Sequence, residues 1–273
     1  MKFDFCSDTH EDFYYGSLLW QDLKNPESDT LILAGDVSND IEKTAEILFE
    51  AKKHYNNVAF IDGNHDNYNI GMMKQDYKSV SENMNYLFTA SIKDGWTYLP
   101  FRDLKINDTV IIGVNGWYSF DSKSVRYTKE EQYNAWKTYM SDSRVIKFDK
   151  APDILAEEQA NYLFDKVSQY NDDETIKNIV ITTHTLPIEE ALIIKTETSH
   201  ADIAWNQMSG SFVNTNMKKV WMNNSKEKIK IWTFGHTHYP KSIVKNNINF
   251  EANPRGYPTE QACIGYKFKQ LEV

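Results

Sequence analysis

Five polar segments, each following directly on a short apolar run, constrain the fold of this 273-residue chain more than any other feature. Each segment carries carboxylate, amide or imidazole side chains, and together they contain five of the seven histidines. In chain order they are Ser7-Asp8-Thr9-His10, Gly35-Asp36, Gly63-Asn64-His65-Asp66, Thr183-His184 and Gly235-His236-Thr237-His238. In layered α/β folds, loops at the carboxyl ends of strands converge on one rim, where ligand sites collect. If the apolar runs are strands, the five segments therefore form one site.

The apolar runs are short and rich in Ile, Val, Leu and Phe, which is typical of strands buried on both faces. We predict strands at Phe3 to Cys6, Thr30 to Ala34, Val58 to Ile61, Val110 to Val114, Ile179 to Thr183 and Ile229 to Phe234. After about residue 232, short runs with Asn and Gly turns favour antiparallel strands at a sheet edge.

Amphipathic stretches lie between the predicted strands. The apolar spacing predicts a helix from Ile41 to Tyr55, with Asp40 or Asn39 as its N-cap. A second helix is predicted from Leu155 to Tyr170, and Pro152 precedes it. Strands that alternate with helices indicate an α/β layered architecture.

Residues 117–149 are dense in aromatic side chains and have no strong strand pattern. Two interpretations remain open for this excursion: helices packed on the body of the protein, or a rim or lid over the site. Tyr68, Trp117, Tyr118 and Trp205 likewise either stack on a substrate base or belong to the core. His200 is a candidate for the border of the pocket, whereas His54 is expected on a helix surface.

Charge and cysteine content exclude some classes of protein. The net charge is −9, which disfavours non-specific attachment to nucleic acid or to anionic membranes. Of the two cysteines, Cys6 lies in an apolar run, so we expect a buried reduced thiol and a reducing compartment. The N-terminus has no signal-peptide pattern, and no apolar run reaches membrane-spanning length. We therefore predict a cytoplasmic protein.

Each polar segment has an ordinary structural explanation when it is considered alone. Asp-x-His and Gly-Asp are common in turns, and a lone His184 is typical of a hydrogen-bonded, partly buried histidine. Gly-Asn-His-Asp also suits a tight turn. Gly-His-Thr-His is harder to explain in this way, because alternate residues beyond a strand can aim two imidazoles at one point. Five such segments in this order argue against coincidence.

As a set, the segments resemble the calcineurin-like metallophosphoesterases. The signature of that family runs D-x-H, G-D-x-x-N/D, G-N-H-D/E, a lone H, and G-H-x-H, and every element is present between Asp8 and His238. The resemblance implies one domain over residues 1–273. It also implies an α/β fold, a four-layer sandwich of two mixed β-sheets flanked by helices, with the metals at one end.

The resemblance also implies a ligand set for two divalent metal ions. One ion would be held by Asp8, His10, Asp36 and His238. The other would be held by Asp36, Asn64, His184 and His236, with the Asp36 carboxylate as the bridge. Nitrogen and oxygen ligands suit Mn²⁺, Fe, Zn²⁺ or Ni²⁺, and we expect Mn²⁺ to support activity in vitro. The ions would make the pocket electropositive in an acidic protein.

The implied reaction is hydrolysis of a phosphate ester by a hydroxide that bridges two metals about 3.5–4 Å apart. His65 lies outside the ligand set, and the resemblance gives it the task of protonating the leaving group or stabilising the transition state. We expect Asp66 to orient the His65 ring, the alternative being a loop cap.

Departures from the family pattern argue against several branches of the family. The segment after Asp36 lacks the Arg of the protein phosphatases, the presence of His10 departs from purple acid phosphatases, and UDP-diacylglucosamine hydrolases have Arg where His65 stands. Small bacterial and phage-type phosphoesterases remain, including cyclic-nucleotide phosphodiesterase-like enzymes. The segment from Asn253 to Tyr257 resembles that group, with Arg255 either reaching the substrate phosphate or solvated in a turn.

We therefore expect a small phosphomonoester or phosphodiester as substrate, and among such esters we favour nucleotide-derived ones. We expect no stable binding to nucleic acid. A DNA or RNA nuclease is disfavoured because no basic stripe is visible. Two alternatives stay open: a catalytically silent metal-binding scaffold of the same fold, and a protein with one structural metal.

Overall fold

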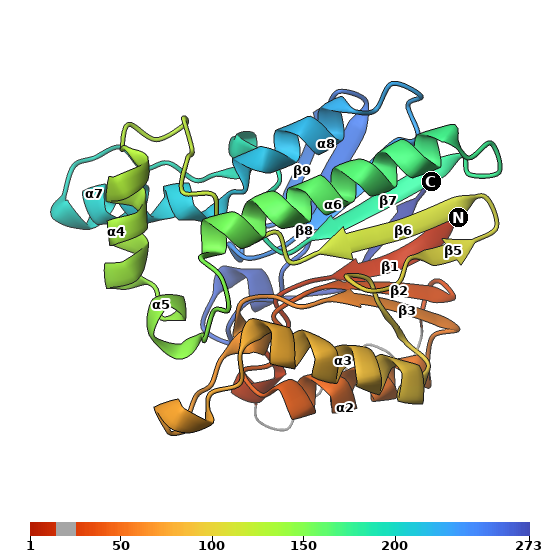
Figure 1. Cartoon of the computed structure of the whole chain (residues 1–273), viewed down its shortest axis with the longest axis horizontal. Helices are drawn as coiled ribbons and strands as arrows, with labels where there is room; N and C mark the ends of the chain where they lie inside the picture. Colours follow the sequence, from red (N-terminus) through yellow and green to blue (C-terminus); the bar gives the residue numbers. More distant parts are fainter. Residues whose placement is uncertain (15–25) are drawn as a thin grey trace.

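The computed structural model describes residues 1–14 and 26–273, which form four layers in the order helices, sheet, sheet, helices (Figure 1). One sheet has five strands in the order β11-β1-β2-β3-β4, and the other has six in the order β5-β6-β7-β8-β10-β9. Each sheet mixes parallel and antiparallel pairs. The predicted sandwich of two mixed sheets flanked by helices is confirmed.

The five-stranded sheet consists of β1 (Lys2–Cys6), β2 (Thr30–Ala34), β3 (Asn57–Ile61), β4 (Thr97–Tyr98) and β11 (Lys269–Glu272). β1 to β4 run parallel, and β11 is antiparallel to β1. Every residue of β2 is buried, as expected for a strand covered on both faces. β1, β2 and β3 match the predicted strands to within one residue.

Two helices cover the outer face of this sheet: α2 (Ile41–Lys52) and α3 (Val80–Asp94). Asp40 caps α2, as predicted, by accepting hydrogen bonds from the backbone N–H groups of residues 42 and 43. α2 ends three residues before the predicted Tyr55, so His54 is exposed in the turn that follows. α3 begins with a capping box of Ser79 and Glu82.

The six-stranded sheet consists of β5 (Leu104–Ile106), β6 (Thr109–Val114), β7 (Asn178–Thr183), β8 (Ile229–Phe234), β9 (Lys241–Lys245) and β10 (Ile248–Ala252). α6 (Pro152–Asp172) and α8 (Lys218–Met222) cover its outer face. β9 and β10 form an antiparallel hairpin at the sheet edge, as predicted, and Asn246 and Asn247 turn it with positive φ angles of 51° and 59°.

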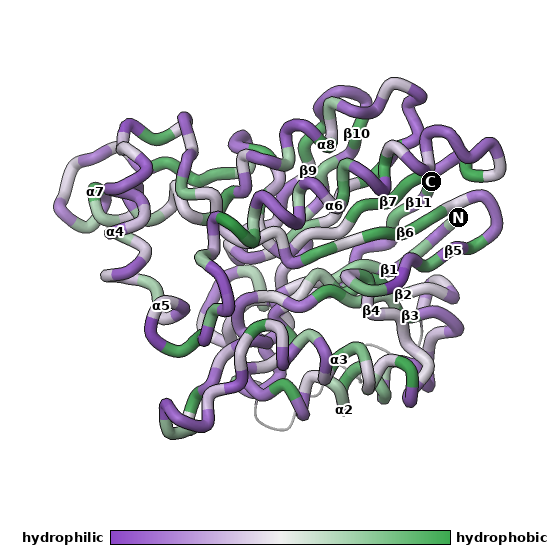
Figure 2. Tube along the Cα trace, viewed as in Figure 1, coloured by the Kyte–Doolittle hydropathy of each residue, from purple (hydrophilic) through white to green (hydrophobic). Residues whose placement is uncertain are grey.

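Three apolar layers hold the sandwich together, and Figure 2 shows the hydrophobic strands running through the middle. The central layer lies between the sheets and includes Phe3, Phe5, Ile32, Ile111 and Val180, all without exposed surface. The other two lie between each sheet and its helices. Cys6 is a buried free thiol, as expected from its apolar run. No helix of the described residues is long and apolar enough to cross a bilayer.

Three further helices lie beyond the arrowheads of the strands, on the left of Figure 1: α4 (Lys129–Tyr139), α5 (Asp142–Val145) and α7 (His200–Ser209). Trp117, Tyr118 and Trp136, the last of them on α4, are buried in one aromatic cluster. Residues 117–149 thus contain packed helices, and Met140 of this segment also faces the site. Whether the segment works as a lid stays a prediction.

Candidate metal centre

The predicted site residues lie at the carboxyl ends of five strands. Asp8 and His10 follow β1, Asp36 follows β2, Asn64, His65 and Asp66 follow β3, His184 follows β7, and His236 and His238 follow β8. The two sheets place these ends at one rim, so segments up to about 230 residues apart in the chain meet there.

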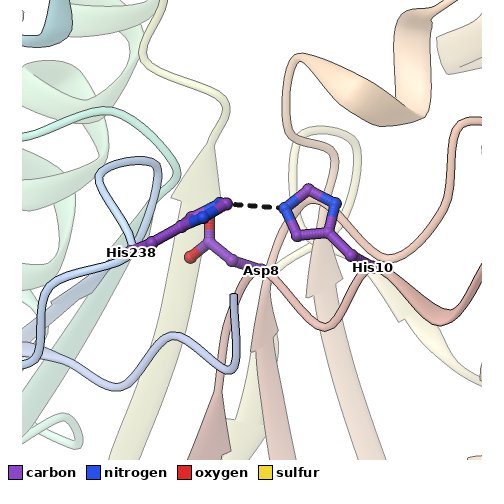
Figure 3. Close-up of side chains that lie close together, drawn as sticks. All are labelled: Asp8, His10 and His238. Carbon is purple, nitrogen blue, oxygen red and sulfur yellow. Dashed lines mark hydrogen bonds and ion pairs between the residues drawn. The ribbon is translucent and has the colours of Figure 1, made fainter. Parts of the chain in front are cut away.

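One group of donors comes from the first and last motifs. Asp8, His10 and His238 each offer a ligand atom, and these atoms lie within 4.8 Å of one another. Figure 3 shows the two imidazoles pointing toward each other, with the Asp8 carboxylate beside the His238 ring; Nε2 of His10 lies 2.9 Å from Nε2 of His238. Nε2 of His238 is also 3.6 Å from Oδ1 of Asp8. The three side chains converge on one point from two different sheets.

A second group lies beside the first. Asp36, His184 and His236 offer ligand atoms within 4.8 Å of one another. The amide oxygen of Asn64 joins them, at 2.9 Å from Nε2 of His184 and 3.0 Å from Nδ1 of His236. Asp36 also groups with His10 and His65 within the same limit. Its carboxylate therefore lies between the two sets of donors.

The chemistry of these donors fits divalent cations. Oδ2 of Asp8 and Nε2 of His236 are buried and have no hydrogen-bond partner among the described residues. Such polar atoms are costly to bury unless something binds them. Burial lowers the pKa of His10 and of His236 well below the usual value, which keeps both imidazoles neutral and able to donate a lone pair. Nitrogen and oxygen donors of this kind suit Mn²⁺, Fe, Zn²⁺ or Ni²⁺.

Charge within the site favours an ionised Asp36 carboxylate. Burial alone would raise the pKa of Asp36, but His184 and His65 beside it hold that pKa well below the usual range. Oδ2 of Asp36 lies 3.1 Å from Nε2 of His184, and Oδ1 accepts a hydrogen bond of 2.8 Å from the backbone N–H of His65. Asp36 therefore presents a fixed carboxylate to the centre of the site.

The backbone at this rim is held in an uncommon conformation. Asp8, His10, Asp36, His236 and His238 all have positive φ, between 44° and 75°. Non-glycine residues in this region are uncommon and concentrate where surrounding structure enforces them, often at functional sites. Among the neighbouring glycines, a Cβ atom at Gly63 would overlap the carboxylate of Asp36. Close packing of loop against loop therefore aims the side chains inward.

His65 is oriented by residues that the sequence prediction missed. Its Nδ1 lies 2.6 Å from Oδ1 of Asn39, and Asn39 donates a 2.7 Å hydrogen bond to Asp12. The ring stacks on Tyr68, and its Nε2 lies 3.3 Å from the hydroxyl of Tyr257. Asn39 is the last residue of the G-D-x-x-N/D motif that begins at Gly35. Its fixed spacing from Asp36 in that motif was the sequence signal that could have pointed to its role.

The prediction that Asp66 orients His65 is wrong. The buried Asp66 carboxylate instead accepts hydrogen bonds from the backbone N–H groups of residues 36, 37, 38 and 63 and from the Thr44 hydroxyl. A carboxylate surrounded by four backbone donors ties one loop to another. Asp66 therefore positions Asp36 rather than His65, which is closer to the loop-capping alternative.

Asp142 is a second residue that the motifs did not reveal. It begins α5, has no exposed surface, and accepts hydrogen bonds from Tyr68 (2.5 Å), Tyr118 (2.7 Å) and the Asn64 amide (3.1 Å). By accepting from Nδ2 of Asn64, Asp142 leaves Oδ1 of Asn64 facing the histidines. No sequence pattern joins position 142 to position 64, so only the fold could reveal this contact.

The C-terminal segment completes the rim. Glu260 holds Nδ1 of His238 at 2.6 Å and accepts from the backbone N–H of Tyr257, whose ring stacks on His10. Both roles predicted for Arg255, contact with the substrate phosphate and a solvated position in a turn, are wrong. Arg255 is only 8% exposed, pairs with Glu11 at 2.5 Å, and lies 3.6 Å from the ring centroid of Tyr14. It is a buried structural residue, neither solvated nor in the pocket lining.

A cavity of about 750 Å³ opens beside the donors. Asp36, Asn64, His65, His236 and His238 contribute to its wall, together with Met140, Trp205, Phe212, Tyr239 and Tyr257. Tyr68, Trp117 and Tyr118 are buried and do not line it, whereas Trp205 does. His200, the candidate for the pocket border, is exposed on α7 and is not part of the lining.

A sandwich of two mixed sheets with this cluster of His, Asp and Asn at one rim defines a metal-dependent phosphoesterase. The model of the family described as calcineurin-like phosphoesterase matches residues 1–240, and the chain belongs to that family. It is thus a phosphoric ester hydrolase of a family that uses divalent metal ions. Among curated protein sequences, none matches the chain.

Solved structures with a similar fold include enzymes of the same superfamily. One is the phosphopantetheinyl hydrolase from Mycobacterium tuberculosis, at 16% identity and a TM-score of 0.75, covering 99% of this chain and 95% of that one. Another is a 5'-nucleotidase from Candida albicans, at 14% identity and a TM-score of 0.42, covering 98% of this chain and 51% of that one. The first likeness supports the fold.

Proposed function

We propose that this protein hydrolyses small phosphomonoesters or phosphodiesters at a dinuclear metal centre bridged by Asp36. The observation that carries the proposal is the position of Asp36 between two converging sets of nitrogen and oxygen donors. Asp8, His10 and His238 would hold one ion with Asp36. Asn64, His184 and His236 would hold the other. Of the suitable ions, we expect Mn²⁺ to support turnover in vitro.

Two divalent ions would supply the Lewis acidity that activates water at neutral pH and neutralises the phosphoryl oxygens. The protein supplies the rest. His65 faces the cavity and is not among the seven ligands proposed for the two ions, and Asn39 fixes one nitrogen of its ring. The other nitrogen is directed toward the cavity side, next to the Tyr257 hydroxyl. We assign His65 to proton donation to the leaving oxygen, and Asn39 to positioning its ring.

A pair of variants tests the proposal. Asp36→Ala should lose bound metal and turnover together. His65→Ala should keep about two ions per chain and lose roughly 10²–10⁴-fold in kcat, the usual contribution of a general acid. Bound metal is counted by elemental analysis, and turnover is measured with p-nitrophenyl phosphate and bis(p-nitrophenyl) phosphate in Mn²⁺. Equal loss of metal in both variants would contradict the role of His65.

The same measurements separate the alternatives. A silent scaffold would bind metal and turn over no phosphate ester, and a structural site would bind a single ion. All of the predicted donor residues are present, which favours an enzyme over a silent scaffold. A nuclease would cleave DNA or RNA in preference to the small esters, and the net charge of −9 argues against that outcome. Cytoplasmic location stays a prediction, supported by two free cysteines.

A further inference from the structure

Two chemically different sets of side chains line the cavity beside the candidate metal centre. One set consists of donor residues. The other, called the apolar wall, is apolar or aromatic and consists of Met140, Trp205, Phe212, Tyr239, Pro240 and Ile264; the polar side chains of Thr237, Tyr257, Glu260 and Gln261 complete the lining. A phosphoryl group held at the donors would therefore place the rest of its ester against the apolar wall. At about 750 Å³ the cavity has the size of a small-molecule site.

The apolar wall is continuous with the metal centre and well fixed. Phe212 packs its ring edge-on against the His236 imidazole, with centroids 5.0 Å apart, and Trp205 packs in turn on Phe212 at 5.9 Å. The indole N–H of Trp205 donates a 2.8 Å hydrogen bond to the backbone carbonyl of residue 193. An aromatic surface that is already ordered can bind an apolar group with little loss of side-chain entropy.

Among the described residues, none of those that line the cavity is a lysine or an arginine. Lys195 packs its ammonium 4.5 Å from the ring centroid of Trp205 but is not part of the lining. The carboxylate on the rim, Glu260, already pairs with His238. A second phosphate on the substrate would need charged donors for its oxygens, and a polymer would need a basic track for its backbone. The described walls offer neither.

We propose, on the basis of the function proposed above, that the preferred substrate is a phosphate ester whose alcohol part is uncharged and apolar or aromatic. The donor residues would hold the ions that bind the single phosphoryl group, and the side chains of Trp205, Phe212 and Met140 bind the carbon portion. Esters that carry a further phosphate are poor substrates, because that group meets an apolar surface without a counter-charge.

A matched series of substrates tests this selectivity. With Mn²⁺ in excess, kcat/KM is measured for methyl, ethyl, propyl and butyl phosphate, and for butane-1,4-diyl bisphosphate, which has the same carbon chain with a second phosphate. Each methylene that enters the cavity should raise kcat/KM by up to about fourfold, or roughly 60-fold from methyl to butyl. The bisphosphate should fall at least about tenfold below butyl phosphate.

Two variants with matched controls place the effect in the cavity. Trp205→Ala should flatten the chain-length series, and Phe49→Ala, on the exposed face of α2, should leave it unchanged. Ile264→Lys adds a cation to the cavity wall and should narrow the gap between the bisphosphate and butyl phosphate several-fold. Ile92→Lys adds the same charge on α3, away from the cavity, and should not.

The outcomes separate this inference from the proposed function. Absence of turnover on every ester, including p-nitrophenyl phosphate, would overturn the proposed function. Turnover with a flat chain-length series, or with the bisphosphate cleaved as well as butyl phosphate, would overturn the substrate class and leave the phosphoesterase intact.

Discussion

Replacing Asp142 by Ala should weaken metal binding although Asp142 is not among the proposed metal ligands. The Asp142 carboxylate accepts from Tyr68 and from Asn64 on Oδ1, and from Tyr118 on Oδ2. Alanine has no side-chain acceptor, so all three buried donors lose the carboxylate as their partner. The Asn64 amide also loses the contact that holds its Oδ1 toward the histidines.

The magnitude follows from the number of donors left without an acceptor. Each buried polar group left unsatisfied costs about 1–3 kcal/mol. For a protein of this size, 1 kcal/mol lowers Tm by roughly 2–4 °C. Residues that orient metal ligands typically change metal affinity by about 10–100-fold when they are mutated. We therefore expect Asp142→Ala to bind Mn²⁺ about 10–100-fold more weakly, with Tm lowered by several degrees or more.

Titration calorimetry with Mn²⁺, together with thermal unfolding of the metal-free and metal-loaded protein, measures both quantities. Tyr118→Phe is the matched control, because it removes one donor and leaves the contact of Asp142 with Asn64 in place. It should change Mn²⁺ affinity by less than about threefold. If Asp142→Ala binds Mn²⁺ as tightly as the wild type while Tm falls, the carboxylate supports the fold only and does not orient Asn64.

Three further predictions follow from the site. Asp66→Ala should lower the unfolding free energy of the metal-free protein by about 3–5 kcal/mol, because it removes the acceptor of several buried donors. Urea titrations measure this change, and a value below about 1 kcal/mol would contradict the role of Asp66 in tying the two loops together. Removing metal with a chelator should lower Tm, because a ligand at 1,000 times its Kd stabilises by about 4 kcal/mol. Asp36→Ala should show no such shift. Gly63→Ala should reduce Mn²⁺ affinity, since its Cβ would overlap Asp36, whereas Gly71→Ala has no neighbour within 4 Å and should bind Mn²⁺ normally.

The central strands could be predicted because they are covered on both faces and therefore read as continuous apolar runs. β2 and β8 begin and end at the predicted residues. The edge strand β5 was missed because it is short and its central residue is an exposed lysine. β11 was covered only by the general expectation of antiparallel edge strands after about residue 232, because its exposed alternate residues are polar. α3 was missed although Ser79 and Glu82 form a capping box at its start, a signal that the sequence does contain.

The convergence of the candidate donors could be predicted because each follows its strand directly, so local sequence determines where it lies. Their supporting residues could not. Asp142 and Glu260 reach the site from helical or irregular segments, and their partners, Asn64 and His238, lie 78 and 22 positions away. Asp66 was assigned to the wrong partner because adjacency to His65 in sequence suggested contact, whereas the tight turn directs its carboxylate toward the loop after β2.

The left-handed backbone at Asp8, His10, Asp36, His236 and His238 limits how this protein can be made more stable. Glycine relieves such strain, but at these five positions it would also remove a side chain that the proposed metal site requires. If these residues hold the ions as proposed, thermostability and catalysis compete at the rim. Substitutions intended to raise thermostability are better placed in the outer helices and in the hairpin of β9 and β10, where they leave the candidate donors unchanged.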